Sequence, residues 1–546
     1  MFVQITKSRR GHKVYETYLV RESFRTPKGP RSRTVCNLTA LPPALRQLVA
    51  DSLAGQSFVA ADGVQLPQAL DFGGLAVLVE AWQALGLPQL LAGIGTPRQQ
   101  GLLQAVIFSR LLFPCAKLAL AQHAAGTLLA QACGLPAEER FDQDEIYAAM
   151  DALTGHWCAL EKGLAGAAFR EPVSLVLYDL TSVYFEGAGP QHFGRYGHSR
   201  DHRADRPQII LAVATDPRGV PLHLSVLRGH RADTTTLQGF VKILRRRFQI
   251  REAVFAFDGG MSSQLNLEAL EKSGLKFVTR LSNATLEKLL RELPQEQQLE
   301  LADENKLLEI VHEGKRHIVA GGPWRRQRDQ ERRDTRIAKA AAALTKLAAV
   351  QRRQPNAQKL ASQAGRTLQT LKAHKYFSYE VDAAGVLRWA RKEEVIAAER
   401  AHDGWYLLHT NLPAAEAAPA QVQGHYKNLL EVEEAFCELK SYLRVRPVFH
   451  WRPDRVINHV RLCFVAYWLS ARLATQWRAC GETGEVTRIL RELQTIRLGQ
   501  IRLGGAAAPV LARLTEVPPK LNALLTKLNL LELFATPPKW AAAQPA

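Results

Sequence analysis

Apolar and polar residues alternate along the first part of the chain and then change to a helical spacing. Residues 13–25 alternate as a strand does and precede a turn, so we expect a small β-rich domain over residues 1–55. Further along, apolar residues recur every three or four positions within residues 73–87, 99–113 and 141–157. We therefore expect a helical region over residues 56–170.

Beyond this region the pattern predicts strands that alternate with helices. Strand patterns and helix patterns follow one another in the order β-β-β-α-β-α-β, which is the connectivity of an RNase H-like domain that lacks its last helix. The predicted segments are the strand 173–185, the hairpin 207–229, the helix 232–248, the strand 252–258, the helix 262–274 and the strand 275–282. We expect an α/β catalytic core with a mixed five-stranded sheet, whose first part covers residues 171–282.

The last helix of such a core follows only after a long interruption. Residues 283–411 mix strand patterns with a basic helix at 325–350, and we interpret them as an α+β insertion domain. Tyr426 to Lys440 contain no Gly or Pro and predict a helix, so we expect the core to resume over residues 412–454. Residues 455–546 predict a C-terminal helical region that ends in Pro- and Ala-rich sequence.

The helix from Tyr426 to Lys440 has an unusual polar pattern. Tyr426, Glu433 and Lys440 recur every seven residues, and seven steps fall within about 20° of two full turns. On a continuous helix these three side chains lie on one stripe. The stripe could be functional, or it could be heptad packing with Tyr426 in the core.

Three carboxylates stand where such a core performs chemistry. Asp179 lies in the middle of an apolar strand, Asp258 ends another, and Glu433 lies on the helical stripe. A buried ionised carboxylate needs a partner, and Mg²⁺ takes hard oxygen ligands. Two such ions about 3.5–4 Å apart can activate the attacking oxygen and stabilise the leaving oxygen of a phosphodiester. The alternative is that the two aspartates are a hydrogen-bonded strand residue and a helix cap, and that Glu433 is solvated.

Charge and composition narrow the class of partner. The formal net charge is +19, which favours a polyanion, nucleic acid first and an anionic membrane second. The apolar run 463–471 is too short to span a bilayer and the apolar region 74–95 contains Glu80, so we expect no membrane. The seven cysteines form no C-x-x-C pair, and the N-terminus has no signal-peptide pattern, so we expect a cytoplasmic, nucleoid-associated protein.

The motifs resemble a known family. "YDLTSVYFEG" and "FDGGMSS" resemble the first-Asp and second-Asp segments of DDE transposases of bacterial insertion sequences. Tyr426, Glu433 and Lys440 match the subgroup whose last helix carries Y-x-x-R-x-x-x-E-x-x-x-x-x-x-K, with Leu429 at the Arg position. The resemblance implies Asp179, Asp258 and Glu433 as catalytic metal ligands for Mg²⁺ or Mn²⁺, with two ions expected. It also implies phosphate contacts from Tyr426 and Lys440.

Other basic and aromatic residues are candidates for DNA contact. Arg203 ends the basic stretch 194–203, and Arg325 and Arg326 begin the basic helix of the insertion. Trp324 precedes that helix, and the resemblance implies that an insertion-domain aromatic stacks on an unpaired base. The alternatives are a solvated helix and a structural Trp. We find no phosphate-binding loop and expect no use of ATP.

The resemblance implies a transposase that cleaves insertion-sequence ends and transfers the 3′ ends to target DNA by metal-dependent phosphoryl transfer. The alternatives are a transposase-derived DNA-binding protein without catalysis and an RNase H-like nuclease. We expect residues 56–170 to recognise the inverted repeats at the element ends, with help from the insertion. A homodimer or larger synaptic complex is implied, because two ends are cut together.

Overall fold

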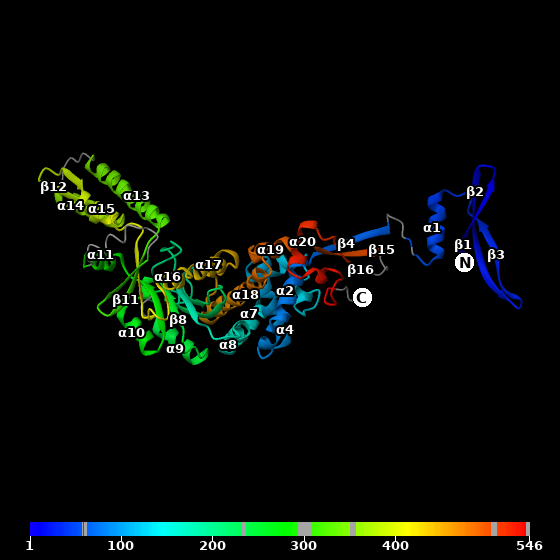
Figure 1. The fold of residues 1–546 in the computed structure, drawn as a ribbon, viewed down its shortest axis with the longest axis horizontal. Helices are drawn as coiled ribbons and strands as arrows, with labels where there is room; N and C mark the ends of the chain where they lie inside the picture. The colour runs from blue at the N-terminus through cyan, green and yellow to red at the C-terminus, as the bar shows by residue number, and fades with distance from the viewer. Residues whose placement is uncertain are drawn as a thin grey trace.

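The computed structural model describes residues 1–56, 58, 63–231, 236–292, 307–349, 356–503 and 510–541. The molecule is elongated (Figure 1). A small N-terminal β unit lies at one end and the helices of the insertion lie at the other, with a helical body and a mixed sheet between them.

The N-terminal unit is an antiparallel sheet with one helix. Its strands β1 (Phe2–Arg10), β2 (Lys13–Thr26) and β3 (Gly29–Asn37) lie in the order β1-β2-β3. Helix α1 (Pro43–Leu53) packs on one face of this sheet, where the Arg46 guanidinium lies 4.3 Å from the centre of the Tyr18 ring. One face of the sheet is thereby left without a covering element in the described part of the chain.

A helical body follows the N-terminal unit. Its helices are α2 (Gly73–Ala84), α3 (Leu87–Leu91), α4 (Pro97–Leu112), α5 (Leu120–Ala124), α6 (Leu129–Ala132), α7 (Gln143–Ala152), α8 (Trp157–Ala168), α18 (Pro453–Ala479) and α19 (Val486–Leu493). They share one apolar core, although the sequence separates the first seven from the last two. At Gly73 and Gly74 a Cβ would lie 2.0 Å and 2.7 Å from backbone oxygens of α19, so this contact requires glycine. Among the described residues no single helix could cross a bilayer, whereas α4 and residues 117–124 reach that length and apolarity only together, across a 92° bend.

The helical body also contains a small sheet that the sequence pattern did not predict. Strands β16 (Val510–Leu514), β15 (Arg497–Leu503) and β4 (Val64–Asp71) pair in that order, so the regions 56–170 and 455–546 are not purely helical. These strands are short, and β4 and β15 are more than 400 residues apart in sequence, so local periodicity gives little signal for their pairing. After α20 (Pro519–Lys527), Trp540 stacks on Phe72 with ring centres 5.7 Å apart. The C-terminal segment therefore packs against the start of α2.

The centre of the molecule is a mixed sheet with the strand order β10-β11-β14-β9-β8-β5-β6-β7. The five strands expected from the sequence are β5 (Leu175–Tyr184), β6 (Gln208–Thr215), β7 (Pro221–Arg228), β8 (Val254–Phe257) and β9 (Lys276–Arg280). Strand β5 pairs antiparallel with β6 and parallel with β8. Helices α9 (Leu237–Arg247) and α10 (Gln264–Lys272) connect the later strands.

The sheet is mixed, as expected, but it has eight strands rather than five. Three of them, β10 (Leu308–His312), β11 (Lys315–Ala320) and β14 (Tyr406–Thr410), come from the segment interpreted as an insertion. Strand β14 pairs with β9 and β11 pairs with β14, so backbone groups at the edge of β9 gain partners. The rest of the insertion has a small apolar core of its own. It comprises α13 (Pro323–Ala348), α14 (Ala357–Thr370), β12 (Phe377–Val381), β13 (Leu387–Arg391) and α15 (Glu393–Arg400).

The predicted helix from Tyr426 to Lys440 is also not continuous. Helix α16 (Pro419–Lys427) ends at a turn, α17 (Leu430–Cys437) follows, and a π-helix, η6 (Glu438–Tyr442), ends the segment. A π-helix has more residues per turn than an α-helix, so it rotates the side chains that follow away from an α-helical stripe. The three residues of the stripe therefore lie on three different elements.

A buried ion pair joins the insertion to the central sheet. Both guanidinium NH₂ groups of Arg333 on α13 donate hydrogen bonds of 2.6 Å to the carboxylate of Asp403. Asp403 lies just before β14, and the two side chains are only 3% and 8% exposed. This pair fixes α13 relative to a strand of the sheet.

We expect Asp403→Ala to destabilise the protein by about 3–5 kcal/mol, because it leaves the Arg333 charge buried without a partner. Denaturant unfolding followed by fluorescence measures this change. Arg388→Ala is the matched control in the same part of the chain. It removes an exposed pair whose atoms are 3.8 Å apart, and it should cost less than about 1 kcal/mol. Equal effects of the two substitutions would contradict an anchoring role for Arg333 and Asp403.

Candidate active site

The three carboxylates predicted from the sequence line one cavity of about 600 Å³. Tyr178 of β5 pairs with Phe257 of β8, so the next residues along these parallel strands, Asp179 and Asp258, lie side by side. Glu433 comes from α17, which packs against β5. Residues that are far apart in sequence are therefore brought to one place by a strand pairing and one helix contact.

The carboxylates influence one another electrostatically. The pKa of Asp179 is raised to about 7, first because the side chain is buried and further because Asp258 and Glu433 are negative neighbours. A hydrogen bond with the Leu180 backbone and the charge of Arg200 oppose this shift. Burial and the charge of Asp258 also raise the pKa of Glu433. The cavity therefore stabilises a positive charge placed among these side chains.

The three carboxylates share the cavity without forming a ready-made metal cluster. In the described part of the chain, no three His, Cys, Asp or Glu side chains are close enough together to hold a metal ion. The resemblance to DDE transposases implied that these three residues ligate metal ions together. Like charges repel, so ionised carboxylates approach to ligand distances only around a cation. The donor set itself consists of hard oxygens, which suits Mg²⁺ with water as the remaining ligands.

Aromatic rings and cations also line the cavity. Tyr426, Trp324 and Arg325 lie here, as do Tyr406 and Arg328. The Trp324 side chain is 70% exposed, and the Arg328 guanidinium lies 4.7 Å from its ring centre. Burial, together with the charge of Asp258, raises the pKa of Tyr426 to about 12, so its hydroxyl keeps its proton and can donate a hydrogen bond.

Positive charge is concentrated on the side of the cavity formed by the insertion. The buried Nε atoms of Arg325 and Arg328 have no hydrogen-bond partner among the described residues. Burial and the charges of Arg280 and Arg328 lower the pKa of Arg325. An anion at this place would satisfy these donors and reduce the repulsion among the cations.

The structure adds cavity residues that the sequence analysis missed or set aside. Arg280 ends β9, Arg328 lies one helical turn after Trp324, and Tyr406 begins β14. Leu429, at the Arg position of the signature, lines the cavity, and so does Lys427. The basic helix pattern could have indicated Arg328. For Arg280 there was no sequence signal beyond its position near the end of the fifth predicted strand.

Lys440 does not line the cavity, contrary to what a continuous stripe implies. Its ammonium donates a hydrogen bond of 2.8 Å to Asp201, whose side chain is 5% exposed, and Arg446 lies 3.4 Å from the same oxygen. The π-helix that contains Lys440 turns it toward the loop after β5. Burial lowers the pKa of Lys440, and the Asp201 charge opposes that shift.

Two further predicted contacts also lie outside the cavity lining. Arg203 forms an ion pair of 2.8 Å with Asp205 and lies 5.0 Å from the centre of the Tyr184 ring. Arg326 is on the first turn of α13 beside Arg325, but it is not one of the cavity residues. The structure therefore groups Asp179, Asp258, Glu433, Tyr426, Trp324 and Arg325, and it separates Lys440, Arg203 and Arg326 from them.

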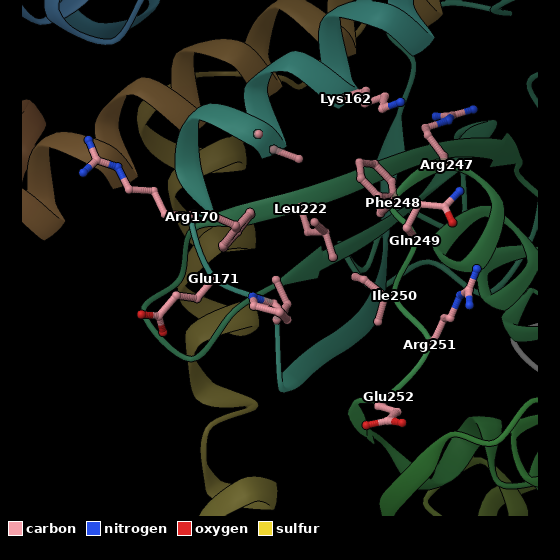
Figure 2. Close-up of a pocket in the computed structure, with 15 residues that line it drawn as sticks. Lys162, Arg170, Glu171, Leu222, Arg247, Phe248, Gln249, Ile250, Arg251 and Glu252 are labelled. Carbon is pink, nitrogen blue, oxygen red and sulfur yellow. The ribbon is translucent and has the colours of Figure 1, made fainter.

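A second cavity, of about 540 Å³, lies near the other end of the same strands (Figure 2). It is bounded by residues just before β5 and β8, with Leu222 and Ile250 among its apolar residues and Lys162 and Arg247 among its charged ones. None of the predicted site residues lines it. The carboxylate cavity is therefore the candidate active site.

A cavity that combines three carboxylates with a cationic lining suits proteins that act on a polyanion such as nucleic acid. Residues 172–469, more than half of the chain, match the family model described as "Transposase DDE domain". The protein belongs to the DDE transposase family.

Comparison with solved structures adds only a distant similarity. A chain of "Cryo-EM structure of piggyBac transposase synaptic complex with hairpin DNA (SNHP)" matches with a TM-score of 0.41 and 8% sequence identity. The match covers 86% of this chain and 84% of that chain. No curated protein matches the sequence. The family assignment therefore depends on the family model.

Asp179 should make the stability of the protein depend on pH. Its folded-state pKa is raised from 3.8 to about 7, so the folded protein binds the proton more tightly than the unfolded chain, and stability falls as pH rises between these values. Burial also raises the pKa of Glu438 to about 7, so a similar fall from that group remains. We therefore expect Asp179→Asn to reduce the fall and to be more stable than the parent near pH 8, by on the order of 2–4 kcal/mol. Denaturant unfolding near pH 5 and near pH 8 measures the difference. The same change in stability between the two pH values in the parent and in the variant would contradict the raised pKa of Asp179.

Lys440 should contribute to stability as well as to any function. We expect Lys440→Ala to cost about 1–3 kcal/mol in the free energy of unfolding, because the buried Asp201 carboxylate loses its shortest donor. Lys440→Met keeps most of the side chain and should cost nearly as much, which would identify the charge as the cause. Unchanged unfolding combined with weaker DNA binding would instead mean that Lys440 leaves Asp201 to contact DNA.

Proposed function

We propose that the protein cleaves the ends of its own mobile element and transfers the 3′ ends to target DNA by divalent-metal-dependent phosphoryl transfer. The observation that carries this proposal is the placement of Asp179, Asp258 and Glu433 around one cavity beside Arg325 and Tyr426. Carboxylates supply ligands for a metal ion, and the neighbouring cations suit the phosphates of the substrate. Membership of the DDE transposase family supports the same reaction class.

We also propose that the catalytic core is RNase H-like. Five consecutive strands of the sheet have the order β7-β6-β5-β8-β9. Three of them form an antiparallel meander, and β8 and β9 add in parallel beside β5. In this arrangement α17 corresponds to the last helix of the core, and it brings Glu433 to the two aspartates.

The residues around the cavity have separate parts in the proposed reaction. Bound Mg²⁺ or Mn²⁺, held by the three carboxylates, would activate the attacking oxygen and stabilise the leaving oxygen. Arg325 and Arg328 would bind phosphate oxygens, and the Tyr426 hydroxyl would donate a hydrogen bond to one. Trp324, exposed beside the carboxylates, would stack on a base displaced from the duplex.

We propose that the protein binds DNA. It would bind the inverted repeats at the element ends and also the target DNA. A homodimer in a synaptic complex would allow two ends to be cut together. The alternatives are a DNA-binding protein without catalysis and a nuclease that does not join ends. Cleavage without strand transfer would favour the nuclease, and end binding without cleavage would favour the DNA-binding protein.

We expect Asp179→Asn, Asp258→Asn and Glu433→Gln each to reduce Mg²⁺-dependent cleavage of end DNA to background. These changes preserve shape but remove the charge that would hold the metal, so end binding should change less than about threefold. A labelled duplex taken from the DNA that flanks the gene measures both properties in the same preparation.

Glu434→Gln is the matched control for Glu433→Gln. Glu434 is the next residue of α17, is exposed and does not line the cavity, so the variant should cut normally. Normal cleavage by Glu433→Gln, or loss of cleavage in Glu434→Gln, would show that the glutamate has been assigned wrongly.

A further inference from the structure

The two faces of the N-terminal sheet differ in their chemistry. Residues 1–55 contain ten Lys and Arg residues and three Asp and Glu residues. In the pairing of β1, β2 and β3, directly opposed residues project from the same face, and successive residues along a strand project from opposite faces. The register therefore assigns each strand residue to the face that α1 covers or to the outer face.

The face that α1 covers holds the acids of these strands. Glu16 opposes Lys7 and Glu22 opposes Arg33, and each pair forms an ion pair of 2.7 Å. Tyr18, which Arg46 of α1 contacts, is on the same face, as is the buried Val20. Cations on this face are therefore partly neutralised within the unit.

Among the described side chains, the outer face has cations and polar groups but no acid. Its polar and aromatic residues are Phe2, Gln4, Thr6, Ser8, Lys13, Tyr15, Thr17, Arg21, Ser23, Arg25, Ser32, Thr34 and Asn37. Arg21 is held across the sheet, because its guanidinium donates hydrogen bonds of 2.7 Å to Gln4 and 3.1 Å to the Ser32 carbonyl. Lys13 and Arg25 are exposed, and the Tyr15 side chain is 51% exposed.

This surface matches the major groove of duplex DNA in size and chemistry. Neighbouring strands are about 4.8 Å apart, so three strands span about 10 Å, and the major groove is about 12 Å wide. Arg and Lys recognise guanine there, Gln and Asn recognise adenine, and Ser and Thr accept or donate at either. A face without acids also avoids repulsion from the phosphates on both sides of the groove.

We propose that the outer face of β1–β3 enters the major groove and reads the sequence of the element ends. This inference rests on the proposed function, and it changes where recognition takes place. The sequence analysis assigned end recognition to residues 56–170, but that region is largely a packed core, and eleven of the sixteen residues of α4 are buried. The N-terminal unit lies at one end of the molecule, where its outer face can contact DNA beyond the cleavage site (Figure 1).

The test compares two double variants of the full-length protein with the same change in charge. Lys13→Ala/Arg25→Ala removes two exposed cations from the outer face, and Arg9→Ala/Arg31→Ala removes two exposed cations from the opposite face. We expect the first variant to lose about tenfold or more of its preference for the flanking-repeat duplex over a scrambled duplex. The second should keep that preference, and both should unfold at the temperature of the parent.

A modified DNA probe tests for the major groove itself. Replacing guanine by 7-deazaguanine removes the N7 acceptor from the major groove and leaves base pairing intact. This probe should weaken binding of the parent and of Arg9→Ala/Arg31→Ala, but it should have little further effect on Lys13→Ala/Arg25→Ala. Equal losses of preference in the two double variants, or no effect of 7-deazaguanine on the parent, would overturn the proposal.

These outcomes are distinguishable from failure of the proposed function. A parent protein that does not prefer or cut the flanking repeat would contradict the proposed function before any variant is compared. A parent that prefers and cuts the repeat, with an outer-face variant that behaves in the same way, would contradict only the reading by β1–β3. Preference of the parent for single-stranded RNA over both duplexes would also overturn it.

Discussion

The parallel pairing of β5 with β8 is the constraint on which the candidate site depends. It places Asp179 beside Asp258 in the middle of a sheet whose neighbouring strands are almost entirely apolar. Burial already opposes ionisation of Asp179, and the second carboxylate increases that cost. The two carboxylates therefore repel each other when both are ionised, and a bound cation would reduce this repulsion.

The insertion supplies positive charge to the same point. Strands β11 and β14 extend the sheet beyond β9, and the Arg333–Asp403 pair fixes α13 against the start of β14. As a result Arg325 and Arg328 line the same cavity as the carboxylates, and the charge of Arg328 acts on Glu433. Acids that suit a metal ion and cations that suit phosphates thus come to one cavity from separate elements.

The π-helix η6 separates the residues of the Tyr-Glu-Lys signature. Tyr426 and Glu433 line the cavity, whereas the π-helix turns Lys440 toward Asp201. Leu429 replaces the expected Arg, and Arg280, Arg325 and Arg328 bring guanidinium groups to the cavity from other elements. The positive charge of the site therefore does not depend on the helix that carries Glu433.

Local sequence was sufficient for features that depend on short-range periodicity and on chemistry. Strand alternation predicted the strands β5 to β9, and helical spacing predicted the helices of the body. The position of Asp179 within an apolar strand was the first sign of the three carboxylates. The same reasoning could not provide β14 as the partner of β9 and β11, or the pairing of β4 with β15, because a strand does not specify a partner that is distant in sequence. It also could not show that Arg280 and Arg328 line the cavity of the carboxylates, or that Lys440 is turned away. Those outcomes are decided by strand pairing, by the buried Arg333–Asp403 pair and by a π-turn, which depend on contacts that form only in the folded chain.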